Sequence, residues 1–338
     1  MNLTGIIAGL LSIALPFGAS FAQATVTMAI GGSSCICYLP AVLARELGEY
    51  DRAGISVNMI DLRGGSDTLT AVLSGSADVA VGYFDHCVQL AAKQQELQSF
   101  VVFDRYPGEA IVVSPRHLTE IHLLSDLAEK KVGVTAPGST SDFFLKFLLK
   151  KSGIDPATVS VIGIGVGATT VAAMEQGRVD AAVMVDPSTT YLQMTHSNLK
   201  VLVDTRSEQD ARSVFGGDYP GGALYSTTAW LGSHQKEAQA LSDAIVRTLA
   251  WIHSHSPEEI MAKMPSDSIG NDRGLYLLAL KSSIHMFSDT GRMDPKGAKT
   301  VLSVFEQNSA AIAHATIDIG KTYTNRFVDH SKGTPSAN

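Results

Sequence analysis

Short apolar runs alternate with segments of helical periodicity from residue 26 onward. The apolar runs, which predict buried strands, cover residues 26–30, 56–62, 78–82 and 100–103. Apolar positions at helical spacing predict helices between them, over residues 40–47, 67–73 and 88–95. Strands that alternate with helices of this length indicate βαβ units, and therefore a mostly parallel sheet flanked by helices.

The same pattern then starts again. Strands are predicted over residues 131–135, 159–164, 180–185 and 199–203, with helices over 141–151 and 169–175. Segment 167–183 repeats segment 65–81, because each contains a glycine loop, a helix, a Gly-x-x-Asp turn and a buried strand. This internal repetition predicts two lobes of like topology. Beyond residue 233 the pattern is mostly helical, over 237–253, 274–287 and 295–314.

The first 24 residues differ from the rest of the chain. Residues 6–17 are largely apolar, and Ala22-Gln23-Ala24 fits the small-x-small pattern of a signal-peptide cleavage site. The apolar run is too short to span a bilayer comfortably. We therefore expect an export signal cleaved after Ala24, with an uncleaved membrane anchor as the alternative. Residues 331–338 are polar and predict a flexible tail.

Composition and charge narrow the class of function. The chain has 338 residues, of which 45% are hydrophobic and 17% charged, and this suits two globular lobes. Its 26 Lys and Arg against 33 Asp and Glu give a net charge of −7. A nucleic-acid-binding protein needs a basic face, so we expect no nucleic-acid partner.

Three cysteines, Cys35, Cys37 and Cys87, are too few for a disulfide scaffold. An exported protein meets an oxidising compartment, so a bridge from Cys87 to Cys35 or to Cys37 is one interpretation. The interpretation we favour is that all three are free thiols, buried or in loops, that take part in no chemical reaction. A zinc site would need a second pair of ligands at suitable spacing, and the sequence offers none. We expect no metal and no cofactor.

Small polar loops follow four of the predicted strands, at residues 31–34, 64–66, 138–141 and 165–168. In open α/β sheets, ligands bind beyond the carboxyl ends of the strands, where helix N-termini favour anions. The alternative is that Ser and Gly only cap helices and permit turns. Because four such loops occur in two repeated units, the sequence predicts a shared cleft that favours anions.

Motifs of common enzymes are absent. The sequence contains no G-x-G-x-x-G in the loop over 163–167, no complete G-x-x-x-x-G-K-[ST] and no G-x-S-x-G. Asp85-His86 follows a buried strand and could form an acid/base pair, but we favour a hydrogen bond to a ligand. Asp186-Pro187 holds the corresponding place in the second repeat, where a turn is the plainer interpretation.

The order of several motifs resembles one family. The motifs are Tyr38-Leu39-Pro40, Ala44-Arg45-Glu46-Leu47-Gly48, Gly64-Gly65-Ser66, Leu73-Ser74-Gly75-Ser76-Ala77-Asp78, Lys131-Val132-Gly133-Val134, Pro137-Gly138-Ser139-Thr140 and Val179-Asp180-Ala181. Over residues 26–205 this order is similar to that of the nitrate/sulfonate/taurine-type substrate-binding proteins of ABC importers, which are related to pyrimidine-precursor proteins. The resemblance implies a two-lobed periplasmic-binding-protein type II fold of α/β class, with a hinged cleft between lobes.

The resemblance also implies domain boundaries and site residues. Lobe 1 would comprise residues 25–110 and 218–330, and lobe 2 residues 111–217, with crossing segments over 101–115 and 216–231. The predicted ligand-binding residues are Ser33, Ser34, Cys35, Gly65, Ser66, Tyr83, Phe84, Asp85, His86, Ser139, Thr140, Gly167 and Asp186. No catalytic residue is predicted.

Together these observations predict a periplasmic, monomeric solute-binding protein that is not an enzyme. It would deliver a small organic anion (a sulfonate, a carboxylate or an aromatic acid) to an ABC permease and its ATPase. Cys35-Ile36-Cys37 and Asp85 depart from the family pattern, so a plain sulfonate or nitrate is in doubt and a zwitterion is a further alternative. The alternatives in function are an enzyme similar to pyrimidine-precursor synthases, or a periplasmic sensor module.

Overall fold

The computed structural model describes residues 23–331. Most of the predicted export signal, residues 1–22, lies outside the described residues, as does the predicted tail beyond Ser331. Within residues 23–331, no helix combines the length and the apolar character that crossing a membrane would require.

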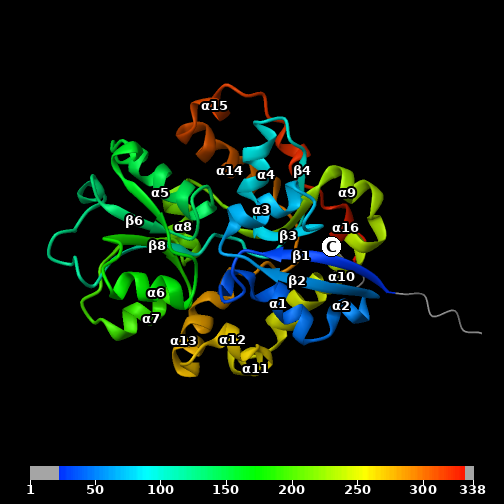
Figure 1. Cartoon of the computed structure of the whole chain (residues 1–338). Helices are drawn as coiled ribbons and strands as arrows, with labels where there is room; N and C mark the ends of the chain where they lie inside the picture. The colour runs from blue at the N-terminus through cyan, green and yellow to red at the C-terminus, as the bar shows by residue number, and fades with distance from the viewer. Residues whose placement is uncertain (1–22, 332–338) are drawn as a thin grey trace, which may run out of the picture.

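The described chain forms two five-stranded sheets (Figure 1). The strand order of the first sheet is β2 (Ile55–Asp61), β1 (Ala24–Ile30), β3 (Val79–Tyr83), β10 (Gly222–Thr227) and β4 (Leu97–Val102). The order of the second is β7 (Ser160–Gly163), β6 (Lys131–Val134), β8 (Ala181–Val185), β5 (Glu109–Val113) and β9 (Val201–Asp204). The first three strands of each sheet pair in parallel. The predicted α/β class and two-lobed architecture are confirmed.

The two sheets repeat one topology. β1 lies between β2 and β3 in the first sheet, and β6 lies between β7 and β8 in the second. In both sheets the fourth position is taken by an antiparallel strand, β10 or β5. The internal repetition seen in the sequence therefore corresponds to a repeated structural unit.

Helices flank both sheets. In the first part of the chain they are α1 (Leu39–Glu46), α2 (Glu49–Arg52), α3 (Gly65–Leu73) and α4 (Asp85–Ala91). Around the second sheet they are α5 (Thr140–Lys151), α6 (Ala168–Glu175), α7 (Ser188–Thr195) and α8 (Glu208–Phe215). Short 3₁₀ helices occur at Ile36–Tyr38, Leu124–Leu127, Pro156–Thr158, Ile284–Met286 and Ile319–Lys321.

The C-terminal part is helical, as predicted. Its helices are α9 (Thr228–Ser233), α10 (Gln235–Ser254), α11 (Pro257–Lys263), α12 (Ser266–Ile269), α13 (Arg273–Ser283), α14 (Pro295–Asn308), α15 (Ala310–Ala313) and α16 (Arg326–Asp329). α10 packs on the first lobe, against α1 and α16. α13 and α14 reach the second lobe, where they pack against α7 and α5 (Figure 1).

The chain crosses between the sheets twice, after β4 and after β9. The predicted crossings, 101–115 and 216–231, are too long. The first includes β5, and the second includes β10 and the start of α9. β5 was missed because it follows β4 without the helix that marks a βαβ unit, and β10 because its residues lie in a segment interpreted as a crossing.

The cysteine prediction is confirmed for Cys87 and wrong for Cys35 and Cys37. Cys35 and Cys37 form a disulfide with their Cα atoms 5.2 Å apart, and Cys87 is a free, buried thiol. Neither bridge to Cys87 exists, since its two possible partners are bonded to each other and Cys87 is buried in α4. The turn that begins the 3₁₀ helix Ile36–Tyr38 brings the two neighbouring cysteines together, which their spacing alone did not indicate.

Candidate functional site

A small cavity lies between the two lobes at the carboxyl ends of their central strands. Its volume is about 20 Å³, which is enough for one water-sized group. The first lobe contributes Gly31, Cys35, Cys37, Tyr38, Gly65 and Tyr83 to its lining. The second lobe contributes Glu109, Thr135, Ser139, Thr140, Ser141, Val166 and Val185. This is the place where the sequence predicted a cleft.

The lobes touch around this cavity, so the structure is a closed form. A Cβ atom on Gly64 of the first lobe would lie 3.0 Å from Thr135 Oγ1 and 3.2 Å from Ala136 Cβ of the second. Gly64 has an extended backbone that any residue can adopt, so glycine is required there by the close approach. Across the same interface, Thr140 Oγ1 donates a hydrogen bond to Asp85 Oδ1 at 3.0 Å.

Two helix N-termini reach the cavity. α3 begins at Gly65 and α5 at Thr140, and both residues line it. Beside α5, Thr135 Oγ1 lies 2.8 Å from Ser139 Oγ and 3.0 Å from Ser141 Oγ. These hydroxyls are engaged mainly with one another, which holds the loop before α5 in place.

Three buried carboxyl groups gather at this interface: Asp85, Asp104 and Glu109, with exposed fractions of 0%, 0% and 3%. Asp85 follows β3, Asp104 lies in the first crossing segment and Glu109 begins β5. Asp85 Oδ2, Asp104 Oδ1 and Glu109 Oε2 have no hydrogen-bond partner among residues 23–331. None of the three forms an ion pair with a described cationic side chain.

Burial dominates the electrostatics of these groups, since a charged carboxylate is poorly solvated in a protein interior. Burial raises the pKa of Asp85 to about 7, against the opposing hydrogen bond from Thr140. Burial, and next the nearby Asp85, raises the pKa of Glu109 well above its usual value. Burial also raises the pKa of Asp104, opposed by the backbone N–H of Gly222.

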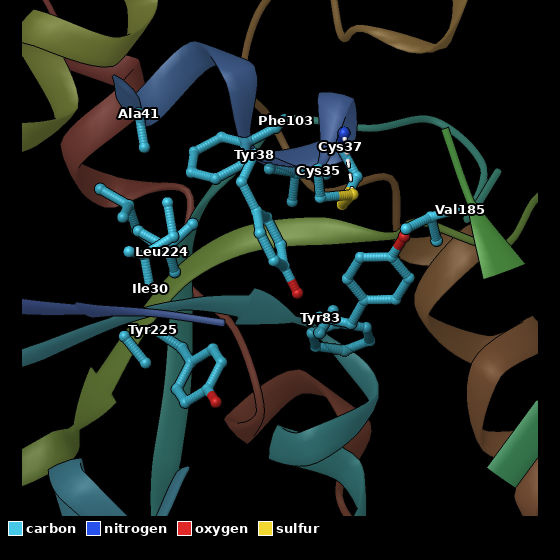
Figure 2. Packing of buried hydrophobic residues seen from close by; sticks show 14 of the residues in the cluster. Ile30, Cys35, Cys37, Tyr38, Ala41, Tyr83, Phe103, Val185, Leu224 and Tyr225 are labelled. Carbon is cyan, nitrogen blue, oxygen red and sulfur yellow. Dashed lines mark hydrogen bonds between the residues drawn. A yellow bond between two sulfur atoms is a disulfide. The ribbon is translucent and has the colours of Figure 1, made fainter. Parts of the chain in front are cut away.

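Tyr38 and Tyr83 form the aromatic wall of the cavity (Figure 2). Their rings meet edge to face with centroids 5.9 Å apart, beside the Cys35–Cys37 disulfide. Tyr83 Oη donates to the carbonyl of Pro107 in the first crossing segment at 2.5 Å. Burial raises the pKa of both phenols well above 10, and the three carboxyls add to this shift, so both remain neutral.

A second cavity of about 10 Å³ adjoins the first, and both are lined by Glu109 and Thr140. Its other walls are mostly aromatic: Phe143, Phe144, Phe147, Phe215, Tyr219 and Phe305, with Val304 and Asn308. Phe215 and Tyr219 stack with ring centroids 4.1 Å apart. Glu109 therefore lies between a polar cavity and an aromatic one.

His86 is buried next to Asp85 but does not form an acid/base pair with it. Its Nδ1 atom lies 3.2 Å from Tyr225 Oη. Burial lowers the pKa of His86 to about 4, and the nearby backbone of Gly138 opposes this shift. A Cβ atom on Gly65 would lie 2.6 Å from His86 Cε1, so glycine at the start of α3 makes room for this ring.

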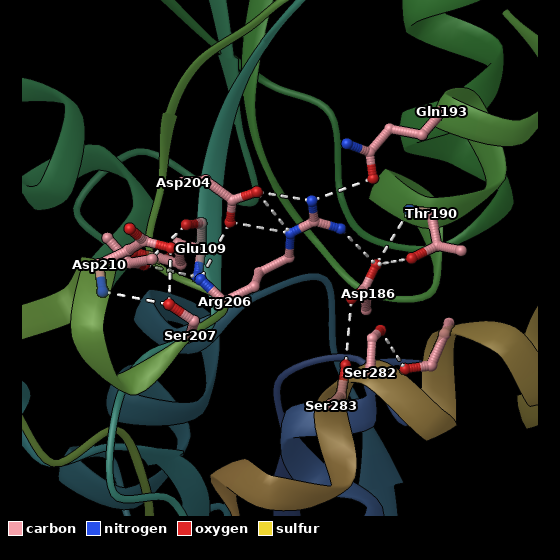
Figure 3. Close-up of polar contacts among 12 residues, drawn as sticks. Glu109, Asp186, Thr190, Gln193, Asp204, Arg206, Ser207, Asp210, Ser282 and Ser283 are labelled. Carbon is pink, nitrogen blue, oxygen red and sulfur yellow. Dashed lines mark hydrogen bonds and ion pairs between the residues drawn. The ribbon is translucent and has the colours of Figure 1, made fainter. Parts of the chain in front are cut away.

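Asp186 has a full set of partners (Figure 3). Its Oδ1 atom accepts from the backbone N–H of Thr190 at 2.9 Å and from Thr190 Oγ1 at 2.8 Å, with Arg206 Nη1 at 3.4 Å. Its Oδ2 atom accepts from Ser283 Oγ of α13 at 3.1 Å. This carboxylate joins the second lobe to the C-terminal helices and does not line the cavity between the lobes.

The structure brings five of the predicted site residues to the cavity: Cys35, Gly65, Tyr83, Ser139 and Thr140. Asp85 and His86 are buried directly behind it, after Phe84, which is buried against Tyr323. Ser66 lies in α3 near Gly138. Ser33, Ser34 and Gly167 line wider surface grooves of about 800 and 560 Å³ instead.

Sequence reasoning missed Tyr38, Asp104, Glu109 and Tyr219. Tyr38 could have been predicted, because it belongs to the Tyr38-Leu39-Pro40 motif on which the resemblance was based. The two carboxyls and Tyr219 lie in or beside the crossing segments, where the pattern predicted only connection. Within residues 23–331, no group of three or more His, Cys, Asp or Glu side chains is placed to hold a metal ion.

Comparisons with known proteins agree with this geometry. A family model described as NMT1/THI5 like matches residues 37–260. A comparison with curated proteins gave no match. A solved structure from Bordetella bronchiseptica RB50 is 35% identical with a TM-score of 0.87, covering 91% of this chain and 96% of its own.

Two less similar structures share the fold. The alkanesulfonate-binding protein SsuA from Xanthomonas axonopodis pv. citri, bound to MOPS, has 15% identity and a TM-score of 0.69, with coverage of 89% of this chain and 98% of its own. The periplasmic nitrate-binding protein NrtA from Synechocystis PCC 6803 has 15% identity and a TM-score of 0.63, with coverage of 90% and 87%. The resemblance drawn from the sequence is thereby confirmed: the chain has the fold of the periplasmic substrate-binding proteins of ABC import systems and belongs to the NMT1/THI5-like family.

Proposed function

We propose that this protein captures one small organic molecule between its two lobes and delivers it to an ABC importer. The observation that carries the proposal is the cavity to which both lobes contribute, lined by Glu109, whose Oε2 atom lacks a protein partner. Ligand pockets combine an apolar or aromatic wall with a few converging polar groups, and this cavity has both.

The chemistry of the cavity supports binding rather than catalysis. Cys35 is oxidised in its disulfide with Cys37 and offers no thiolate. Ser139 Oγ donates to the carbonyl of Ala136 at 2.6 Å, and His86 lies against Tyr225 instead of beside a nucleophile. An activated nucleophile needs a base within hydrogen-bond reach. The alternative of a pyrimidine-precursor-synthase-like enzyme has no specific observation in its favour.

Capture requires the lobes to separate and close again. The closed cavity holds about one water-sized group, whereas pockets for organic ligands occupy about 300–1,000 Å³. The two crossing segments, after β4 and β9, are where torsion changes would open the cleft. The solute would enter the open form and be enclosed as Gly64 approaches Thr135.

The proposal includes the remaining predictions on location and partners. We propose a periplasmic monomer that meets an inner-membrane permease and its ATPase, because a receptor alone cannot move a solute across a membrane. The sequence predicts an anionic solute, whereas the proposed function itself requires only a small organic molecule. The N-termini of α3 and α5 at the cavity support an anion, since helix N-termini favour negative charge by about 0.3–1 kcal/mol each.

Thermal unfolding tests the function. The purified protein is heated with sulfonates, carboxylates, aromatic acids, amino acids, pyrimidines and amines, each in separate samples. A true solute at about 100 times its dissociation constant stabilises the folded state by about 2.7 kcal/mol, which raises the melting temperature by several degrees. Chromatography of the same samples should show the compound unchanged. Consumption of the compound over time would contradict a receptor and favour an enzyme.

A further inference from the structure

We propose that the solute binds through a positively charged nitrogen, an ammonium or amidinium group, that is received by Glu109 between the polar and the aromatic cavity. This inference rests on the proposed function. It replaces the solute class predicted from the sequence, an anion, with a cation. Two observations carry it: three buried carboxyl groups at the interface, each with one oxygen that lacks a hydrogen-bond partner, and the aromatic walls on either side of Glu109.

The carboxyls come from three separate parts of the chain and meet only when the lobes are together. Asp85 belongs to the first lobe, Asp104 to a crossing segment and Glu109 to the second lobe. Asp85 is close enough to Glu109 to influence its ionisation, and all three influence Tyr83. Closure thus concentrates negative charge in a buried place.

Nothing positive in the described protein compensates this charge. Neither cavity is lined by a described Lys, Arg or His side chain. Arg206, a partly buried cation of the second lobe, is paired with Asp204 and Asp186. Buried charges in proteins are normally paired, because an unpaired one is very costly. A solute with a positive nitrogen would supply the missing partner.

The aromatic cavity favours the same solute. Rings of Phe144, Phe215 and Tyr219 surround the space on one side of Glu109, and Tyr38 and Tyr83 lie on the other. The face of an aromatic ring attracts a cation, and more strongly where water is excluded. An ammonium group bound to Glu109 would therefore place its apolar body against these rings.

The groups at the cavity that favour an anion are the N-termini of α3 and α5, and they contribute less charge than the three carboxyl groups. At the start of α5, the Gly138 N–H is taken by Asp142 Oδ2 at 2.7 Å, and the Ser139 hydroxyl by the carbonyl of Ala136. A helix N-terminus contributes the equivalent of about half a positive charge. Two such termini do not balance three buried carboxylates, so an anion would enter an unfavourable potential.

Charge also couples binding to closure. Without a cation, the lobes can close only if the carboxyls keep protons, because like charges in a buried place repel. A bound ammonium group permits closure with the carboxyls ionised. The solute therefore shifts the equilibrium toward the closed form through its own charge, which is a differential interaction of the kind that a ligand-driven change requires.

The test uses probes with one aromatic body and different charge: phenethylamine, phenethyl alcohol and phenethylsulfonate. Benzamidine, cadaverine and choline extend the cationic set to other shapes. Melting temperatures of the purified protein are measured with each compound, and dissociation constants by calorimetry. We expect at least one cation to raise the melting temperature by several degrees, and the alcohol and the sulfonate to have no effect.

A matched pair of variants locates the cation. Glu109→Gln keeps the size of the side chain and removes its charge, and it should weaken binding of the cation at least tenfold. Glu129→Gln makes the same change at an exposed residue of the same lobe and should have no effect. Asp85→Asn, which changes a second carboxyl of the cluster, should weaken binding in the same direction if Glu109→Gln proves unstable.

The pH dependence supplies a second readout. Affinity for an ammonium group should rise with pH as the carboxyls ionise, and fall only when the amine loses its proton. The other titratable groups at the cluster stay neutral: burial raises the pKa values of Tyr38, Tyr83 and Tyr219, and lowers that of His86 to about 4. An anionic solute would show the opposite slope.

The outcomes separate the two claims. Binding of a cation that is lost in Glu109→Gln and strengthens with pH supports the inference. Binding of the sulfonate or another anion, or cation binding unaffected by Glu109→Gln and Asp85→Asn, overturns the inference and leaves the receptor function in place. If no compound of any charge binds, including those of the wider panel above, both the inference and the proposed function are overturned.

Discussion

Asp85 and Asp186 stand at corresponding points of the two lobes, directly beyond the repeated strands β3 and β8. Both are buried, yet their surroundings are opposite. Asp186 accepts hydrogen bonds from Thr190 and Ser283 and pairs with Arg206. Asp85 has the hydrogen bond from Thr140 and one oxygen without a partner. The repeated fold therefore supplies the same position twice, once with both carboxylate oxygens partnered and once with a buried oxygen left without a partner.

The largest predicted difference is in stability. Asp186→Asn removes the charge that compensates Arg206 and turns an acceptor into a donor opposite Thr190 or Ser283. Breaking a buried ion pair at one partner costs about 3–5 kcal/mol, and we expect a loss near 3 kcal/mol because Arg206 keeps Asp204. Urea unfolding at neutral pH measures it. A change below about 0.5 kcal/mol would mean that Asp186 is not a structural residue.

Asp85→Asn should raise the stability of the protein, whereas Asp186→Asn lowers it. Because burial leaves Asp85 uncompensated in the absence of solute, the neutral amide should stabilise the protein by about 1 kcal/mol at pH 8. The folded-state pKa of Asp85 is raised from 3.8 to about 7, so its contribution to stability is full below pH 4 and is lost as the pH rises toward 7.

The stability gained by the variant should therefore grow as the pH rises from 4 to 7, because the buried aspartate loses its proton over this range and the amide has none to lose. His86 titrates with the opposite sign over part of this range, since burial lowers its pKa. It is present in both proteins, so its contribution largely cancels in the difference. Urea unfolding of both proteins at several pH values checks the slope, and a flat difference would show that Asp85 is not an uncompensated buried acid.

The smallest predicted effect on stability concerns contact between the lobes at Gly64. Gly64→Val introduces side-chain atoms against Thr135 and Ala136 and should keep the lobes slightly apart. We expect affinity for the solute to fall about tenfold, equivalent to about 1.4 kcal/mol, with little change in stability, because the backbone at Gly64 is extended.

Gly232→Ala is the control for that variant, since nothing lies within 4 Å of the added methyl group. Small-angle X-ray scattering with saturating solute reports closure directly. Unchanged affinity and unchanged closure in Gly64→Val would show that the contact at Gly64 does not limit capture.

The repeated strands were predictable from sequence because a helix precedes each of them and an apolar run fills them. β5 and β10 were not, because both are antiparallel strands that lie within segments interpreted as crossings. Glu109 begins β5, so its position at the cavity could not be inferred once that strand was missed. The sequence predicted that Asp85 and Asp186 both lie beyond the ends of the strands, but it could not show that only Asp186 has a full set of partners. Their partners Thr140, Arg206 and Ser283 lie 55, 20 and 97 residues away.

Proton release on binding tests the central claim most directly. Titration of the purified protein with phenethylamine, or with the strongest cation of the panel, is repeated at pH 7 in two buffers of different ionisation enthalpy. If a positive nitrogen compensates the buried carboxyls, binding lowers their pKa values and releases protons, and Glu109→Gln reduces the number released. Proton uptake, or no proton exchange together with tight binding of an anion, would contradict this account.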